Sequence, residues 1–323
     1  MDQPTKSTYL QAEAFSNRRV SVAKVIGFVL VCLLPFAIAW GSTRLLSNLI
    51  VENETFSQIP LIPLVSAFLI FENRKSVFSN VSSSWMTAVV LLVPGAVLLA
   101  ASHMNLWRLT QTNPQSLFVF AIVCIWLGAF ALFFGESAFR AALFPLLFLL
   151  FMVPIPEPFL SKAIYLLQAG SAVFVEAFFA AAGIPYHRQQ FIFELPGVAI
   201  RIAEECSGIR STLALLITTV LASYIFLKTP WKRLALCLAV IPVALFKNGL
   251  RIATLSILSV YVNPAFLYGN LHHRGGIVFF VIALIPMALL LKFLQKSEAP
   301  SFAAPAVAGI LSSPSRAIPR NNP

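Results

Sequence analysis

The sequence predicts an all-α polytopic membrane protein. Hydrophobic residues make up 59% of its 323 residues and charged residues only 11%, whereas soluble domains carry about 25% charge. The mean hydropathy is +0.85. Apolar runs recur along the chain, and several approach the roughly 20 residues that a helix needs to cross a bilayer. Together these observations predict about eight transmembrane helices.

The apolar runs fall into two groups. The longer ones cover residues 20–40, 85–101, 117–135, 213–227, 234–245 and 277–291. Two shorter, proline-flanked runs, 59–71 and 141–153, are expected to cross as well, with a buried or re-entrant helix as the alternative. We expect the first run to be a retained helix, because no small-residue cleavage site follows it. Residues 160–183 carry Lys162, Gln168 and Glu176, which favours an interfacial or re-entrant helix that does not cross completely.

The positions of lysine and arginine predict that both termini are cytoplasmic, because positively charged loops stay inside. With the N-terminus inside, 14 of the 23 basic residues lie on the cytoplasmic side. Six of the other nine fall between Arg188 and Arg274. The net charge of +11 is explained by anchoring residues and by contact with anionic membrane lipid, so we expect no nucleic-acid partner.

One membrane domain, residues 20–295, accounts for most of the chain. Residues 1–19 are expected to form a cytoplasmic N-terminal segment, and residues 296–323, which are rich in proline, serine and alanine, a disordered cytoplasmic tail. Residues 190–195 and 198–203 alternate in polarity or are β-branched around Pro196-Gly197. This pattern predicts a short extracytoplasmic hairpin directly ahead of Cys206.

Cys206 lies in the first of three chemically unusual stretches, Glu204-Glu205-Cys206-Ser207-Gly208-Ile209-Arg210-Ser211. A thiol at a helix start is favoured as thiolate by the helix dipole, and Arg210, one turn further along on the same helix face, is expected to favour the thiolate as well. The alternative is a small apolar cysteine at a loop–helix junction. The other three cysteines lie in apolar runs, and no Cys/His spacing typical of zinc occurs, so we expect neither a metal nor a cofactor.

The second and third stretches carry the other polar groups. In Phe246-Lys247-Asn248-Gly249-Leu250-Arg251-Ile252, Asn248 and Arg251 share a helix face. Polar groups at membrane depth usually face a cavity or a partner, although Lys247 and Arg251 could simply reach the interface. Residues 271–280 include His272 and His273, and a lone loop histidine is usually just solvated. Cysteine, arginine and histidine on one membrane face would supply a nucleophile, a cation for an oxyanion and a general acid/base.

These stretches resemble the exosortase/archaeosortase family of membrane cysteine enzymes. Residues 205–211 are similar to its nucleophile motif, Asn248-Gly249-Leu250-Arg251 to its arginine motif, and His272 followed by Gly276 and Phe280 to its histidine motif. Residues 58–64 and 144–156 are also similar to family segments. The resemblance covers most of the membrane domain.

The resemblance implies roles for individual residues. Cys206 would attack the substrate carbonyl, Arg251 would bind the oxyanion, and His272, which matches the family spacing to Gly276 better than His273 does, would be the general acid/base. The supporting or substrate-binding residues would be Glu205, Ser207, Gly208, Arg210, Asn248, His273 and Gly276.

The resemblance also implies a substrate and a location. The substrates would be exported proteins with a C-terminal sorting signal: a Pro-Glu-Pro-like motif, a transmembrane helix and a basic cluster. The enzyme would lie in the bacterial inner membrane with its active site facing outward. The rival interpretations are a multi-pass transporter, against which the lack of an inverted repeat counts, and a polysaccharide-export assembly factor.

Overall fold

The computed structural model describes residues 21–52, 56–103, 114–263 and 276–298. Helices dominate, as the composition predicts, and one small sheet interrupts them. In chain order the elements are α2 (Val22–Ile38), α3 (Trp40–Glu52), α4 (Leu61–Glu72), α5 (Arg74–Val77), α6 (Trp85–His103), α7 (Pro114–Ala141), α8 (Leu143–Phe148), η3 (Leu149–Met152), α9 (Glu157–Ala181), β1 (His187–Gln189), β2 (Ile192–Leu195), β3 (Val198–Arg201), η4 (Glu204–Cys206), α10 (Ile209–Phe226), α11 (Pro230–Tyr261) and α13 (Gly276–Lys296).

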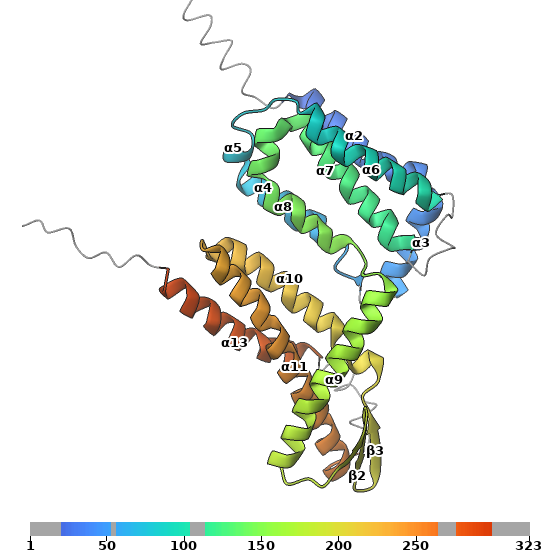
Figure 1. Cartoon of the computed structure of the whole chain (residues 1–323), viewed down its shortest axis with the longest axis vertical. Helices are drawn as coiled ribbons and strands as arrows, with labels where there is room; N and C mark the ends of the chain where they lie inside the picture. Colours follow the sequence, from blue (N-terminus) through green and yellow to red (C-terminus); the bar gives the residue numbers. More distant parts are fainter. Residues whose placement is uncertain (1–20, 53–55, 104–113, 264–275, 299–323) are drawn as a thin grey trace, which may run out of the picture.

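The elements from α2 to η3 form an N-terminal bundle around α7 (Figure 1). Helix α7 is apolar on all sides, and such a helix is stable only when neighbours cover it. Phe118, Ile122 and Phe130 of α7 are almost completely buried. Helices α2 and α3 meet at a bend of 88°. Ser66 of α4 donates to the Pro145 carbonyl of α8 at 2.7 Å, which joins α4 to α8.

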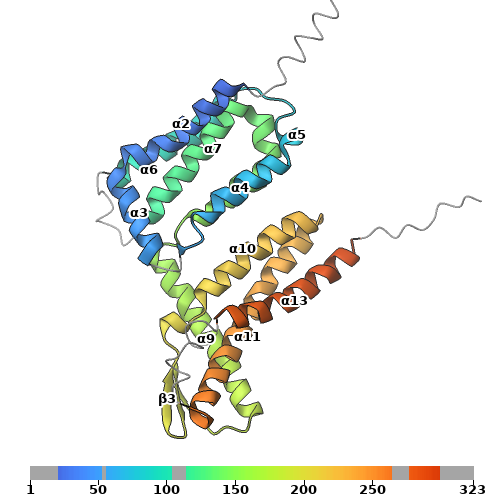
Figure 2. The same ribbon diagram turned by 180° about the vertical axis from the view of Figure 1, so that it is seen from behind.

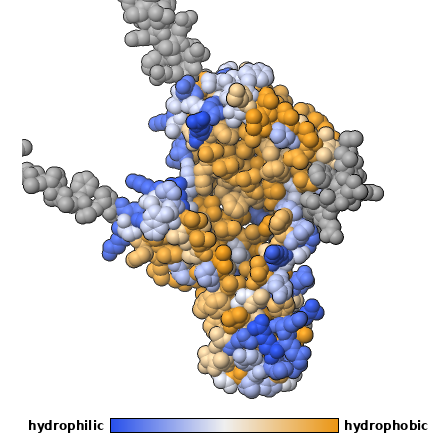
Figure 3. Space-filling view, in the orientation of Figure 1, coloured by the Kyte–Doolittle hydropathy of each residue, from blue (hydrophilic) through white to orange (hydrophobic). Residues whose placement is uncertain are grey.

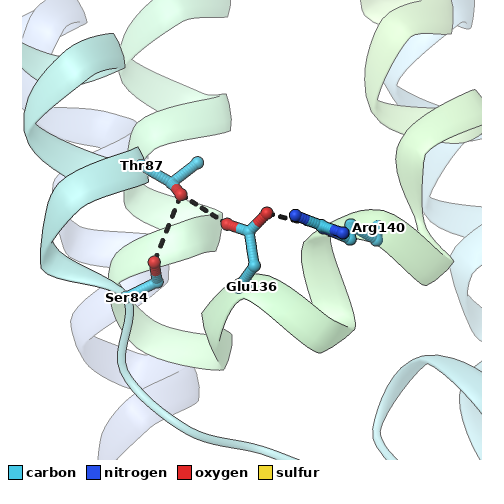
Figure 4. Close-up of polar contacts among 4 residues, drawn as sticks. All are labelled: Ser84, Thr87, Glu136 and Arg140. Carbon is cyan, nitrogen blue, oxygen red and sulfur yellow. Dashed lines mark hydrogen bonds and ion pairs between the residues drawn. The ribbon is translucent and has the colours of Figure 1, made fainter.

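Helix α7 is broken at Gly135, next to a polar contact that joins α6 and α7. Gly135 has φ of 87°, and a Cβ there would lie 2.4 Å from the Ser82 hydroxyl oxygen, so no side chain fits. Beyond the break, the Glu136 carboxylate accepts hydrogen bonds from the Thr87 hydroxyl and from Arg140 Nε, the latter at 2.8 Å (Figure 4). This contact fastens the start of α6 to the end of α7.

The elements from α9 to α13 form a C-terminal unit, seen from two sides in Figures 1 and 2. Helices α10, α11 and α13 pack around Leu215, Leu236 and Met287. Helix α9, the sheet and the C-terminal part of α11 pack around a second cluster that includes Phe179 and Phe193. The Phe144 ring of α8 stacks on the Tyr224 ring of α10 with 3.6 Å between centroids, which links the unit to the N-terminal bundle.

The sheet confirms the predicted hairpin. Strands β2 and β3 pair antiparallel across Pro196-Gly197, where Gly197 adopts φ of 82° as a tight turn requires. Strand β1 was not predicted. It pairs antiparallel with β2, so the strand order is β1-β2-β3.

The membrane class is confirmed, and the number of crossings is close to that predicted. Six described helices are long and apolar enough to span a bilayer, or seven if the bent pair α2 and α3 is one span. Helix α4 and the segment from α8 to η3, predicted as short crossings, are apolar but shorter than those six.

Helix α9 differs from expectation. It is continuous over 25 residues and qualifies as a span by length and composition, whereas the sequence predicted an incomplete crossing there. Its polar residues do not break it, because they have partners in the hairpin region: Gln168 donates to the Ile202 carbonyl at 2.9 Å, and Glu176 pairs with Arg188 at 2.8 Å.

The surface has the distribution of a membrane protein. Figure 3 shows hydrophobic residues over the middle of the molecule, with hydrophilic residues gathered at its upper end and over the sheet at its lower end. Large apolar side chains are exposed on the outer helices; Met86 is 83% and Ile277 is 72% exposed. Such surface is stable in contact with lipid and costly in contact with water. Residues 1–20 and 299–323, predicted as cytoplasmic segments, fall outside the described residues.

Candidate functional site

Cys206 closes the short helix η4 and lies between the sheet and α10. The Cys206 N–H donates to the Ala203 carbonyl at 3.0 Å, which tightens the turn that follows β3. Gly208 then adopts φ of 80°, and α10 begins at Ile209. A left-handed residue is readily tolerated only as glycine, so Gly208 reorients the chain between the cysteine and the helix.

This helix start corrects one prediction. The argument that Arg210 shares a helix face with Cys206 requires a single helix through both residues. Gly208 separates η4 from α10, and Arg210 is exposed. The charges acting on the Cys206 thiol are instead those of Arg251, from α11, and of Glu205, and the two act in opposite directions.

Asn248 of α11 joins the second stretch to the first. Its Nδ2 donates to the Cys206 carbonyl at 2.9 Å, the Ser207 carbonyl at 3.1 Å and the Ser171 hydroxyl at 3.0 Å. The side chain is only 2% exposed. The two N–H groups of Nδ2 are shared among these three acceptors, whereas Oδ1 has no hydrogen-bond partner among the described residues. Asn248 therefore holds the carbonyls of two successive residues, Cys206 and Ser207.

Two glycines allow this close approach. A Cβ at Gly208 would lie 2.8 Å from Asn248 Oδ1, and a Cβ at Gly249 would lie 2.5 Å from the Phe174 Cβ of α9. Both distances are too short for real atoms, so η4, α9 and α11 meet where only hydrogen atoms fit. Glycines at such positions permit helix contacts that larger residues prevent.

Lys247 is buried. The alternative that its side chain simply reaches the membrane interface is therefore wrong. Lys247 is 3% exposed, and its Nζ donates to the Ser211 hydroxyl in the first turn of α10. Ser211 in turn donates to the Gly208 carbonyl at 3.0 Å. Lys247 therefore fastens the start of α10 to α11 beside the cysteine.

Arg251 lies one turn beyond Lys247 on the same face of α11 and is half-buried. Its positive charge acts on both the Cys206 thiol and the Lys247 ammonium. Of the charges that act on the Cys206 thiol, the Arg251 guanidinium is the one that favours the ionised form.

Helix α9 supplies two site residues that sequence reasoning did not single out. Ser171 accepts from Asn248, and Gln168, one turn earlier, holds the Ile202 carbonyl four residues before Cys206. Both are buried. Their three-residue spacing within the apolar middle of the helix was the available signal, because polar residues on one helix face usually contact a partner.

The remaining predicted site residues have different surroundings. Ser207 is 1% exposed, and Glu205 is exposed. Gly276 is the first residue of α13. His272 and His273 lie outside the described residues, so their predicted role stays a prediction. Among the residues that the structure describes, no group of three or more His, Cys, Asp and Glu side chains could hold a metal ion.

The described site therefore combines a half-buried thiol, a neighbouring guanidinium, a buried ammonium and a rigid amide. A thiol is a nucleophile when ionised, and fixed cations stabilise an oxyanion as it forms. This set is chemically suited to acyl transfer through a thioester.

Comparison with known proteins identifies a family. Residues 40–289 match the family described as transmembrane exosortase. The match covers more than half of the chain and includes η4, α10 and α11. The searches of curated proteins and of solved structures each gave no match.

Proposed function

Because the chain belongs to the transmembrane exosortase family, we propose that Cys206 is the nucleophile of this membrane transpeptidase or protease. The general role follows from the family. The assignment of Cys206, Arg251 and His272 to the chemistry is our proposal, as are the substrate and the side of the membrane on which the site works.

One observation carries the assignment: the Asn248 amide binds the carbonyls of both Cys206 and Ser207. The two stretches are 42 residues apart in the chain, and nothing in local structure requires them to meet. A buried amide that joins the cysteine turn to the arginine helix supports a common function, because burying an amide is costly and its donors are used here on the residues around the thiol. Arg251, one turn from Asn248, then lies beside the nucleophile.

The proposed first half-reaction is acylation. The Cys206 thiolate attacks the carbonyl carbon of the scissile peptide bond, and the π electrons move to oxygen. Arg251 stabilises this oxyanion with its guanidinium, and Lys247 adds a second positive charge one turn away. The intermediate collapses to a thioester, the carbon–nitrogen bond breaks, and His272 protonates the departing amine.

The second half-reaction releases the product. Water or an amine attacks the thioester carbonyl and passes a proton to His272. The Cys206 sulfur leaves as thiolate, which regenerates the enzyme. Hydrolysis or transfer to another molecule then depends only on which nucleophile reaches the acyl group.

We propose that the site faces the extracytoplasmic side of the bacterial inner membrane. Helix α10 leads from Cys206 to a basic group that contains Lys228, Lys232 and Arg233. Its 18 residues are about 27 Å long, close to the thickness of the hydrocarbon layer. Basic clusters remain in the cytoplasm, so the opposite end of α10 is outside. The substrate would be an exported protein whose C-terminal signal holds a transmembrane helix beside the enzyme.

The test is processing of a reporter that ends in a Pro-Glu-Pro-containing segment, a transmembrane helix and a basic cluster. Cys206→Ala is expected to abolish processing. Cys237→Ala is the matched control, since Cys237 is also half-buried but lies in the membrane part of α11, and it should process the reporter like the wild type. Unchanged processing by Cys206→Ala would refute the proposal.

A membrane-impermeant thiol reagent tests the side of the membrane. Applied to the outer face of intact spheroplasts, it should label Cys206 and not Cys237. Labelling of Cys206 only after the inner face is exposed would reverse the proposed orientation.

A further inference from the structure

The backbone of β3 has one side that is not used within the sheet. The Ile202 N–H donates to the Phe191 carbonyl at 2.8 Å, in the same register that pairs Arg201 with Ile192. In an antiparallel pair, hydrogen-bonded and non-hydrogen-bonded residues alternate. Val198 and Ile200 therefore bond to β2, and the N–H and C=O groups of Ala199 and Arg201 point to the opposite side.

This side of β3 is an edge of the sheet. The strand order leaves β3 with a single neighbour, β2. Within the described part of the chain, no residue makes a hydrogen bond to the backbone of Ala199 or Arg201 outside the sheet. The side chains of both residues are exposed. An edge strand of this kind is a template for another extended chain.

The strand is also held rigidly. Ile200 is buried against the apolar cluster between the sheet and α9. Beyond the strand, the Ile202 carbonyl is fixed by Gln168. The edge is therefore in place before any partner binds, which lowers the entropic cost of binding.

The position of β3 relative to Cys206 indicates which chain would bind at this edge. Strand β3 ends at Arg201 and η4, with Cys206, follows after two residues. Figure 1 shows the sheet on one side of η4 and α10 leaving on the other. A chain that runs parallel to β3 therefore arrives at Cys206 with its carboxyl end, and its next residues continue in the direction of α10.

We propose, on the basis of the proposed function, that the substrate segment directly before the scissile bond binds as a fourth strand, parallel to β3, through the backbone of Ala199 and Arg201. The transmembrane helix of the substrate then follows α10 into the bilayer. An antiparallel strand would draw that helix out of the membrane toward the hydrophilic surface of the sheet. Strand addition recognises the backbone and leaves the substrate side chains to set specificity.

The first test removes one donor from the edge. In Ala199→Pro the strand loses only an N–H that points away from β2, and edge positions of this kind accept proline. The KM for the reporter is expected to rise roughly tenfold, the effect of about one hydrogen bond, with kcat little changed. Ala199→Ser keeps the N–H and should retain most of the processing. The rate at which a small reagent alkylates Cys206 should stay at the wild-type value, which shows that the nucleophile is intact.

The second test measures register and direction without relying on turnover. Ala199→Cys and Arg201→Cys are each combined with Cys206→Ala and with alanine at the other native cysteines. Each is paired with reporters that carry one cysteine ahead of the cleavage site. Neighbouring strands lie about 4.8 Å apart, within disulfide reach. Crosslinks should recur at every second reporter position, and moving the cysteine from 199 to 201 should shift them toward the cleavage site.

The outcomes separate the two proposals. A shift away from the cleavage site, or no crosslink at any position, would overturn the strand proposal, as would a wild-type KM for Ala199→Pro. If Cys206→Ala abolishes processing in the same experiments, the proposed function stands even when the strand proposal fails. If Cys206→Ala processes normally, the proposed function itself has failed.

Discussion

The N-terminal bundle and the C-terminal unit bury different kinds of side chain. Among the described residues, the buried polar side chains of the N-terminal bundle are Ser66, Ser102 and Ser116, whereas the C-terminal unit buries two lysines, an asparagine and a glutamine as well as hydroxyls. Burying charge is costly unless it is paired or used. The difference supports the proposal that the N-terminal bundle is a scaffold and that the C-terminal unit carries the chemistry.

Among the variants that compare the two regions, Asn248→Ala is expected to have the largest effect. The substitution leaves the carbonyls of Cys206 and Ser207 without their shared donor, and a displacement of about 1 Å at a reacting group can cost about a hundredfold in rate. Processing of the reporter should fall by about that factor. The matched control in the other region is Asn73→Ala, which removes a side chain bonded to the Leu69 carbonyl at 3.0 Å and should leave processing at the wild-type level. Equal losses in both variants would erase the distinction between the regions.

Lys247→Met is expected to lower processing by about tenfold, since a hydrogen bond to a charged group contributes about 1.5–3 kcal/mol. Lys232→Met is its counterpart. Lys232 is also buried, at 6% exposure, but its Nζ donates to Ser297 at the far end of the unit, at 2.8 Å. This variant should unfold at a lower temperature and still process the reporter. Processing by Lys247→Met at the wild-type rate would mean that the buried ammonium serves stability alone.

Gly249→Ala and Gly135→Ala each add a methyl group at a tight contact, the first in the C-terminal unit and the second in the N-terminal bundle. Each added methyl group would overlap a neighbour, Phe174 at 2.5 Å or Ser82 at 2.4 Å, and overpacking costs about 1–3 kcal/mol. Both variants should be less stable in thermal unfolding. Only Gly249→Ala should also lower kcat, by a few fold, because α11 carries Asn248 and Arg251. An equal fall in kcat for Gly135→Ala would show that the bundle shapes the site directly.

The smallest effect concerns pH and the end of the C-terminal unit that carries Lys228 and Glu298. The Glu298 carboxylate accepts the N–H groups of Lys228 and Thr229 ahead of α11, and these contacts lower its pKa from 4.5 to about 2. The stabilisation is complete above pH 4.5, the unfolded pKa, and is lost as the pH falls toward 2.

Glu298→Gln should therefore lower the midpoint of thermal unfolding at pH 7, and the difference from the wild type should narrow as the pH falls below 4.5. If the difference in unfolding midpoint between Glu298→Gln and the wild type does not change with pH, the ionised carboxylate is not the cause of that difference.

Local sequence predicted the features that local chemistry determines. The long apolar helices follow from composition, and the hairpin follows from alternation around Pro196-Gly197. Strand β1 was missed because His187-Arg188-Gln189 has no apolar alternation. The break at Gly135 was missed because glycine within an apolar run does not by itself indicate a kink.

The site was only partly predictable, for a different reason. Cys206, Asn248 and Arg251 were singled out individually, and the family resemblance joined them. The burial of Lys247 depends on Ser211, 36 residues away, and the contribution of Ser171 depends on a contact across 77 residues. Such contacts arise from helix packing, which residue spacing within one segment cannot reveal.

The most direct test of the central claim is the mass of the enzyme during turnover. The wild-type protein is mixed with the reporter, quenched in acid, digested and analysed by mass spectrometry. We expect the Cys206 peptide to carry the N-terminal fragment of the reporter as a thioester that hydroxylamine removes. Complete processing with no adduct on Cys206 at any time point, or an adduct on another residue, would contradict the account.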